Sequence, residues 1–290
     1  MRTDRSKGLI FVISGMLLMT LDPVFIRLSG ASGFETAFLF GLFTFVSMSV
    51  FTALKGKGGI SGTLRTGGLP MIISGLIMGG SGTTLVLSVK HTLVANTMLI
   101  MSTTPVFSAV FSRILLKERT NTRTWAASAV SIFGIYIIAR GSFGTGSLFG
   151  DGMAVLCTAF ASLNYVMWRK YPHISRSMSV ALGGLSIAAF SFLPAALSSL
   201  SLRTWLVMMA MGLLSAPFGR TFVSTSARYI PATEISLFAF LRTVLAPAAV
   251  WLIFAERPAQ SSFYGGSVIL FALITLTWVN YRREAAAKAL

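Results

Sequence analysis

The sequence predicts an all-α integral membrane protein with ten transmembrane helices, arranged as two inverted five-helix repeats. Composition is the first reason, because 54% of the 290 residues are hydrophobic and only 11% are charged. A soluble domain carries about 25% charged residues, so this chain has too little polar surface to coat a water-soluble particle. The second reason is that apolar runs of membrane-spanning length recur along the whole chain. The third is an internal repeat that relates the two halves.

Turns rich in charge, Gly, Pro, Ser or Asn separate the apolar runs. Each run is long enough for a membrane helix of about 20 residues, and each is expected to be helical because lipid cannot satisfy an open backbone. The first run is therefore predicted to be a span and not a cleavable signal peptide. The predicted spans are 8–28, 35–54, 69–89, 95–116, 124–140, 152–168, 179–197, 205–226, 234–254 and 264–281.

The distribution of basic residues predicts the orientation. The chain has 24 Lys and Arg against 8 Asp and Glu. With the N-terminus inside, most of the basic residues fall in inner segments, Arg220 and Arg242 lie within spans, and the outer side holds only Arg27, Lys90, Arg140, Arg203 and Arg257. This asymmetry predicts two cytoplasmic termini in a bacterial-type inner (plasma) membrane. No basic patch is interleaved with polar surface, so the expected partner is the lipid bilayer and not nucleic acid.

Few residues in the chain suit catalysis, metal binding or a cofactor. Cys157 is the single cysteine, and His91 and His173 sit in no ligand-spaced motif. The glycine-rich stretch 55–68 lacks the order of a phosphate-binding loop, so it is expected to be a flexible inner loop. We therefore expect no catalytic residues, no metal and no cofactor. Without an ATP-binding domain, energy for transport would come from an ion or substrate gradient.

The internal repeat joins "SVKHTLVANTMLIMSTTPVFSAVFSRILLKER" (Ser88–Arg119) to "SARYIPATEISLFAFLRTVLAPAAVWLIFAER" (Ser226–Arg257) without a gap. The alignment places Asn96 on Glu234 and Thr104 on Arg242, and both segments close on Glu-Arg.

Each half then holds five spans, and an odd number inverts the second half in the membrane. The expected domains are a first repeat over 1–145, an inverted second repeat over 146–281, and a short cytoplasmic tail over 282–290. Inverted repeats are typical of alternating-access transporters, with a substrate site near the midplane.

The two repeat segments, with "LDPVFIRLSG" near the first span and "YVMWRKYP" closing the sixth, resemble the EamA-type exporters of the drug/metabolite transporter superfamily. The resemblance covers nearly the whole chain. It implies a ten-helix bundle around a central cavity lined by spans 1, 3, 4, 6, 8 and 9. Two positions depart from the family: Phe40 stands where relatives often carry Arg, and Arg242 stands where they often carry Glu. The chemistry of the cavity is therefore expected to differ.

Arg242 is the first candidate for substrate binding. It lies about 12 Å along the helix from Glu234, near the middle of a core about 30 Å thick. Arg at that depth costs at least ~2.5–3.5 kcal/mol, so it is expected to face a cavity or a partner. It could clamp a substrate carboxylate or phosphate with its planar donors. Alternatively, it could form a structural ion pair, for instance with Asp22, or bind the carbonyls of a broken helix.

Asp22 and Glu234 are the candidate residues for coupling transport to an ion gradient. Asp22 is also a candidate for substrate binding. Asp22 precedes Pro23, so it could be a gate or a proton site at a helix break, or simply accompany a kink. Glu234 suits proton carriage or helix capping, and Asn96 is its counterpart in the repeat.

Asn164, Tyr165 and Trp168 near the end of the sixth span could contact substrate, with aromatic stacking, or could form an interfacial belt. Arg220 is expected to reach toward the inner membrane surface. Gly75 and Gly79 form a small-residue face for close helix packing.

The function predicted from these features is secondary export of small organic metabolites, such as amino acids or other anionic or zwitterionic carboxylates, with a proton as candidate coupling ion. A passive small-solute channel or facilitator is the alternative, followed by an integral-membrane enzyme. The sequence leaves open the substrate, the coupling ion, the direction of transport and the oligomeric state.

Overall fold

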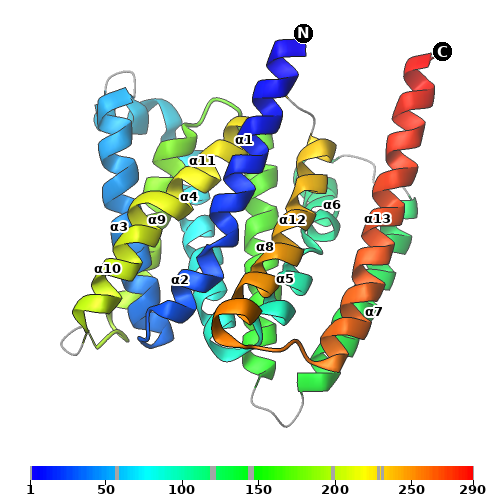
Figure 1. Cartoon of the computed structure of the whole chain (residues 1–290). Helices are drawn as coiled ribbons and strands as arrows, with labels where there is room; N and C mark the ends of the chain where they lie inside the picture. Colours follow the sequence, from blue (N-terminus) through cyan, green and yellow to red (C-terminus); the bar gives the residue numbers. More distant parts are fainter. Residues whose placement is uncertain are drawn as a thin grey trace.

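A computed structural model gives the arrangement of the chain (Figure 1). It describes residues 2–55, 59–117, 122–142, 147–196, 200–226, 229 and 232–289. Within these ranges it does not describe the side chains of 2–5, 122–124, 142, 232–237, 239–240, 273, 276–277 and 280–289.

Ten helical segments make up the described chain, and no strand is found in it. The first half supplies α1 (Arg2–Thr20) with α2 (Asp22–Leu28), α3 (Gly33–Lys55), α4 (Gly59–His91), α5 (Val94–Met101) with α6 (Thr104–Leu115), and α7 (Thr122–Ser142). The second half supplies α8 (Leu148–Lys170), α9 (Arg176–Phe192), α10 (Leu202–Ala210) with the π-helical η2 (Met211–Ser215) and α11 (Ala216–Ser226), α12 (Ala232–Phe254), and α13 (Gln260–Ala289). The number of segments is as predicted. The seventh segment, α9, ends five residues before the end of the predicted span 179–197, and α13 continues into the terminal stretch.

Breaks in the segments occur beside proline. The first segment breaks at Leu21, just before Pro23, and the α5–α6 segment breaks just before Pro105. Proline has no N–H and frees a carbonyl one turn earlier, which interrupts the hydrogen-bond ladder. The π-helical turn η2 lies just before Pro217. In α4, Gly68 has φ of 55°, a conformation that suits glycine, and the membrane part of the helix begins near residue 69 as predicted. Residues 59–67, predicted as part of a flexible loop, are instead helical and join α4 at this kink.

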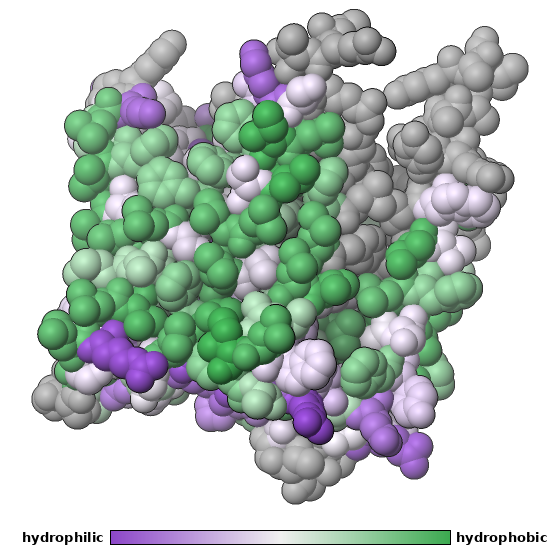
Figure 2. Space-filling view, in the orientation of Figure 1, coloured by the Kyte–Doolittle hydropathy of each residue, from purple (hydrophilic) through white to green (hydrophobic). Residues whose placement is uncertain are grey.

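The surface of the bundle is that of a membrane protein. Hydrophobic side chains cover the middle of the visible face, and hydrophilic ones gather along its lower edge (Figure 2). Five described stretches are long and apolar enough to cross a membrane: Ser6–Leu28, Gly33–Lys55, Gly59–His91, Val94–Leu115 and Leu202–Ser226. Shorter apolar helices cover Trp125–Gly141, Arg176–Phe192 and Leu241–Phe254. The chain is therefore an integral membrane protein.

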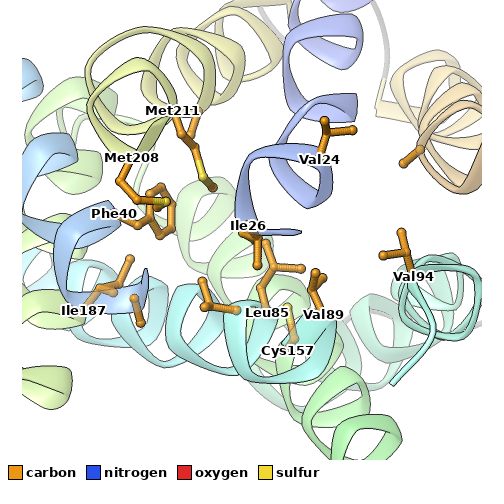
Figure 3. Packing of buried hydrophobic residues seen from close by; sticks show 14 of the residues in the cluster. Val24, Ile26, Phe40, Leu85, Val89, Val94, Cys157, Ile187, Met208 and Met211 are labelled. Carbon is orange, nitrogen blue, oxygen red and sulfur yellow. The ribbon is translucent and has the colours of Figure 1, made fainter. Parts of the chain in front are cut away.

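The core lies where the two halves of the chain meet. Ile26 of α2 packs among Leu85 and Val89 of α4, while Phe40 of α3 lies beside Met208 and Met211 (Figure 3). On the other side of α4, a Cβ added to Gly75 would lie 2.5 Å from the Cβ of Leu182 in α9. A Cβ at Gly79 would likewise collide with Ser186. The predicted small-residue face is thus the contact of α4 with α9.

Both termini lie at one end of the bundle (Figure 1). We call the opposite end the distal end. There α2 and α4 finish, α5, α8 and α10 begin, and the chain passes from α12 to α13 (Figure 1).

Candidate functional site

The break between α1 and α2 packs against η2, the π-helical turn between α10 and α11. Ser215 of η2 donates a hydrogen bond of 2.8 Å to the carbonyl of Leu18, which also accepts from the backbone N–H of Leu21 at the break. Glycines allow α1 and α11 to cross closely, since a Cβ at Gly15 would lie 2.8 Å from the carbonyl oxygen of Gly219. This crossing brings Asp22, the first residue of α2, toward Arg220, the residue after Gly219.

Asp22 and Arg220 form an ion pair inside the bundle. The Oδ2 of Asp22 lies 3.3 Å from the Nη2 of Arg220, and the two side chains are 0% and 13% exposed. The Nη1 of Arg220 donates to the carbonyl of Ala216 at 3.1 Å. Its guanidinium also lies 5.3 Å from the ring centroid of Phe40, a cation–π distance. Arg220 therefore does not reach the membrane surface as expected, but is held inside by three groups.

Phe40, at the position where the family resemblance led us to expect Arg, packs against Arg220. Its ring is 1% exposed and underlies the Arg220 guanidinium. A second guanidinium at this position would repel Arg220, whereas the face of an aromatic ring attracts it. Phe40 therefore stabilises the Arg220 guanidinium inside the bundle.

Arg242 in α12 presents the edge that binds carboxylates. Its Nε and Nη2 atoms are both buried, and neither has a hydrogen-bond partner among the described residues. These two N–H groups point the same way along one side of the planar guanidinium, so they form a two-donor fork. Asp22 lies within electrostatic range of Arg242, but both oxygens of its carboxylate also lack a hydrogen-bond partner in the described chain.

Asp22, Arg220 and Arg242 are called the charge cluster below. Tyr165 and Cys157 of α8 lie within electrostatic range of both arginines. Tyr165 is 45% exposed although α8 runs through the middle of the bundle (Figure 1). Side chains from α2, α8, α11 and α12 therefore converge on one region, and three of the predicted site residues, Asp22, Tyr165 and Arg242, are among them.

Asn164 and Trp168 form contacts between helices and lie apart from the charge cluster. The Nε1 of Trp168 donates to the Oγ of Ser74 at 2.9 Å, and Ser74 donates to the Oδ1 of Asn164 at 2.6 Å. Arg176 packs over the Trp168 ring at 5.3 Å and donates to the Trp168 carbonyl. These bonds tie α8 to α4 and to the start of α9. The structure does not bring Asn164 and Trp168 into contact with the charge cluster.

Asn96 lies at the distal end, apart from the charge cluster. Its Nδ2 donates to the Oδ1 of Asp151 at 3.2 Å, and its Oδ1 accepts from the Oγ of Ser262. Asp151 also accepts a bond of 2.6 Å from the Oγ1 of Thr92. These contacts join α5 to α8 and α13. Asn96 does not cap its helix, because no side-chain cap is found at the start of α5.

A second set of distal contacts joins α2 to the α12–α13 connection, and we call it the distal latch. The Nη2 of Arg27 lies 2.9 Å from the Oε2 of Glu256, and it also donates to the carbonyl of Thr92 at 2.9 Å. The Oε1 of Glu256 accepts from the backbone N–H of Val94 at 2.7 Å, at the N-terminus of α5. The latch connects residues of the first half of the chain to a residue of the second.

The remaining candidates lie elsewhere or outside the description. Glu234 is in the first turn of α12, but its side chain is outside the described residues, as are Glu118 and Arg119 of the repeat. An apolar pocket between α5, α12 and α13 has no charged residue in its lining. In the described part of the chain, no group of three His, Cys, Asp or Glu side chains could hold a metal ion.

Sequence reasoning missed three of the interacting charges. Arg220 lies within a span, and the carboxylate of Asp22 in another span is the sequence signal for its partner. Glu256 stands in the sequence only as the end of a repeat segment, and no pattern marks Asp151. The pairing of Arg27 with Glu256 depends on a connection that is not helical, so no periodicity marks it.

A bundle of apolar helices with charged side chains enclosed among its membrane segments is typical of a membrane transporter. Comparison with known proteins agrees and gives the family. Residues 6–140 match the EamA-like transporter family. The matched residues, the first half of the chain, are therefore an EamA-like domain, in agreement with the resemblance to the drug/metabolite transporter superfamily.

Several relatives are named as transporters. The chain is 27% identical over 178 residues to "Uncharacterized transporter YdfC" of Bacillus subtilis, covering 59% of this chain and 58% of that protein. It is 23% identical to "Pseudopaline exporter CntI" of Pseudomonas aeruginosa, covering 72% and 75%. It is 25% identical to "Riboflavin transporter" of Rhizobium johnstonii, covering 64% and 62%. A crystal structure of a protein with 18% identity covers 94% of this chain with a TM-score of 0.65, which shows that the fold is shared.

Proposed function

We propose that the chain is a secondary transporter that exports small organic metabolites bearing a carboxylate. We further propose that it works by alternating access between two inverted five-helix halves around a central cavity. The observation that carries the substrate class is the buried, unpartnered fork of Arg242 in the described chain.

The energetics of a buried guanidinium support this class. An arginine in the middle of a membrane helix costs at least ~2.5–3.5 kcal/mol on insertion scales, and more when its donors stay unsatisfied. Arg220 is compensated by Asp22, by the Ala216 carbonyl and by Phe40. Arg242 has no such set of contacts among the described residues. A ligand carboxylate would satisfy both of its donors at once, with a charge-assisted bidentate contact.

Three further parts of the proposal rest on the sequence and on the relatives. The basic residues favour cytoplasmic termini, which would make the distal end face outward. The direction, export, follows the name of one relative, an exporter, and the family resemblance. Asp22 is the candidate for proton coupling, because it is a carboxylate enclosed among membrane helices, and Glu234 is the second candidate.

Transport by purified protein in proteoliposomes tests the function. A panel of metabolites that differ in carboxylate content is first ranked by the rise in melting temperature, because a ligand of the native state stabilises it. The best ligand is then used, radiolabelled, for uptake and counterflow. We expect saturable uptake, and counterflow driven by unlabelled ligand on the opposite side.

Each alternative gives a different result. A passive channel gives flux that does not saturate and no counterflow. A membrane enzyme converts the ligand, which mass spectrometry of the vesicle contents detects. If only ligands without a carboxylate stabilise and are transported, the transporter assignment stands but the proposed substrate class is wrong.

A further inference from the structure

The charge cluster contains two arginines but only one carboxylate. Asp22 is paired with Arg220 at 3.3 Å and is completely buried. Arg242 is within electrostatic range of Asp22, yet its fork has no hydrogen-bond partner among the described residues. With Asp22 ionised, the cluster carries one net positive charge.

Arg220 is the fixed member of the pair. Its Nη1 is bound to the carbonyl of Ala216 in its own helix, and its guanidinium lies on the buried ring of Phe40. Asp22 is the member that stands at a break, because α1 ends at Thr20 and α2 begins at Asp22. A ligand that engaged Arg220 would have to displace Asp22 and leave that carboxylate buried without its cation. Breaking a buried pair in this way is strongly unfavourable, because it leaves an uncompensated charge in the interior.

The free energy of binding at the charge cluster depends on the number of negative charges that the ligand carries. A ligand with one carboxylate can take the fork of Arg242 and leave the Asp22–Arg220 pair intact. A ligand with two carboxylates has only one unpaired cation to meet, because Asp22 already neutralises Arg220. Its second negative charge is therefore left without a cation and is repelled by the Asp22 carboxylate.

We propose that Asp22 is the residue that determines charge specificity: by neutralising Arg220 it restricts the site to ligands with a single negative charge. This inference rests on the proposed function, in which Arg242 receives the carboxylate. Removing the charge of Asp22 leaves two positive charges and opens Arg220 to a second carboxylate. Asp22 then acts on specificity without having to touch the ligand.

Two probes of equal length test the inference, butanoate with one carboxylate and butanedioate with two. Their dissociation constants are measured by calorimetry or ligand-induced melting on the purified full chain at neutral pH. We expect the wild type to prefer butanoate. Asp22→Asn should move the ratio of the two constants toward butanedioate by at least about tenfold.

A double variant separates charge from fold. Arg220→Gln with Asp22→Asn restores one net positive charge while it removes the ion pair, so its preference should return to butanoate. Glu35→Gln is the matched control, because Glu35 is a buried acid at the start of α3 that accepts from the backbone N–H of Ser32. It should leave the ratio as in the wild type.

The outcomes distinguish this inference from the function on which it rests. If the wild type binds neither probe, the carboxylate class proposed for Arg242 fails, and the role of Asp22 fails with it. If the wild type binds butanoate but the ratio is the same in Asp22→Asn, only the role of Asp22 is wrong. If Asp22→Asn loses butanoate as well as butanedioate, Asp22 contacts the ligand directly and the inference is also wrong.

Discussion

The distal latch should control which side of the transporter is open. Arg27 and Glu256 join α2 to the α12–α13 connection, and Glu256 also accepts from the Val94 N–H at the start of α5. If the halves separate at the distal end during transport, these contacts exist only in the distally closed state. Glu256→Gln keeps the size of the side chain and removes its charge, so it should weaken that state.

The magnitude follows from the geometry. The ion pair is short, at 2.9 Å, but its side chains are 25% and 17% exposed, so it belongs between exposed and buried pairs. Exposed pairs are worth about 0.2–1 kcal/mol, and a hydrogen bond to a charged acceptor about 1.5–3 kcal/mol. Glutamine retains part of the bond to Val94. A net loss of about 2 kcal/mol corresponds to a shift of roughly 30-fold toward the distally open state.

Cysteine labelling measures this shift. Tyr165→Cys in a Cys157→Ser background places a thiol at a half-exposed position within range of both arginines. We expect a membrane-impermeant thiol reagent applied at the distal side to label it roughly 30-fold faster when Glu256→Gln is added. Arg27→Gln should act similarly, and the two changes together should be less than additive because they remove the same contact. An unchanged labelling rate with a lowered melting temperature would refute the reasoning and leave the latch a static contact.

Three further predictions concern orientation, coupling and packing. Thr122→Cys, at the first residue of α7, should not react in intact cells with an impermeant reagent applied outside; efficient labelling there would reverse the proposed orientation. Asp22→Asn should bind a monocarboxylate but lose gradient-driven accumulation in proteoliposomes, because it cannot exchange a proton; undiminished uphill transport would remove Asp22 from coupling. Gly75→Val should lower the melting temperature by the equivalent of about 1–3 kcal/mol, since its Cβ would lie 2.5 Å from that of Leu182. Gly152→Ala, where a Cβ meets nothing within 4 Å, is the control for Gly75→Val, and equal melting of the two variants would contradict the packing argument.

The fold could be predicted from the sequence because a small number of strong physical constraints determine where membrane helices form. Apolar length, backbone satisfaction and proline positions predicted the ten segments and the break before Pro23. Arg242 could be singled out because a charge in an apolar run is costly wherever it lies. These arguments use only the local sequence and its distance from the membrane surface.

The partners of the charges could not be predicted in the same way. Which carboxylate meets which arginine depends on the crossing of α1 and α11, set by the close approach of Gly15 to Gly219. The rotation of α8 about its axis decides that Tyr165 is exposed while Asn164 is buried against Ser74. A helix that is apolar on most sides gives little periodicity from which to infer that rotation. The sequence therefore identified Arg242 but assigned Arg220 to the membrane surface.

Ligand binding by Arg242 variants, measured together with their melting temperatures, tests the central claim most directly. Arg242→Lys keeps the charge but loses the planar fork, and Arg242→Gln loses both. The account predicts weaker binding of a monocarboxylate by the Lys variant and still weaker binding by the Gln variant, with melting temperatures close to the wild type. Arg203→Gln, an exposed arginine at the start of α10, is the control and should bind normally. Normal carboxylate binding by Arg242→Gln, with a much lower melting temperature, would contradict the account and make Arg242 a structural residue.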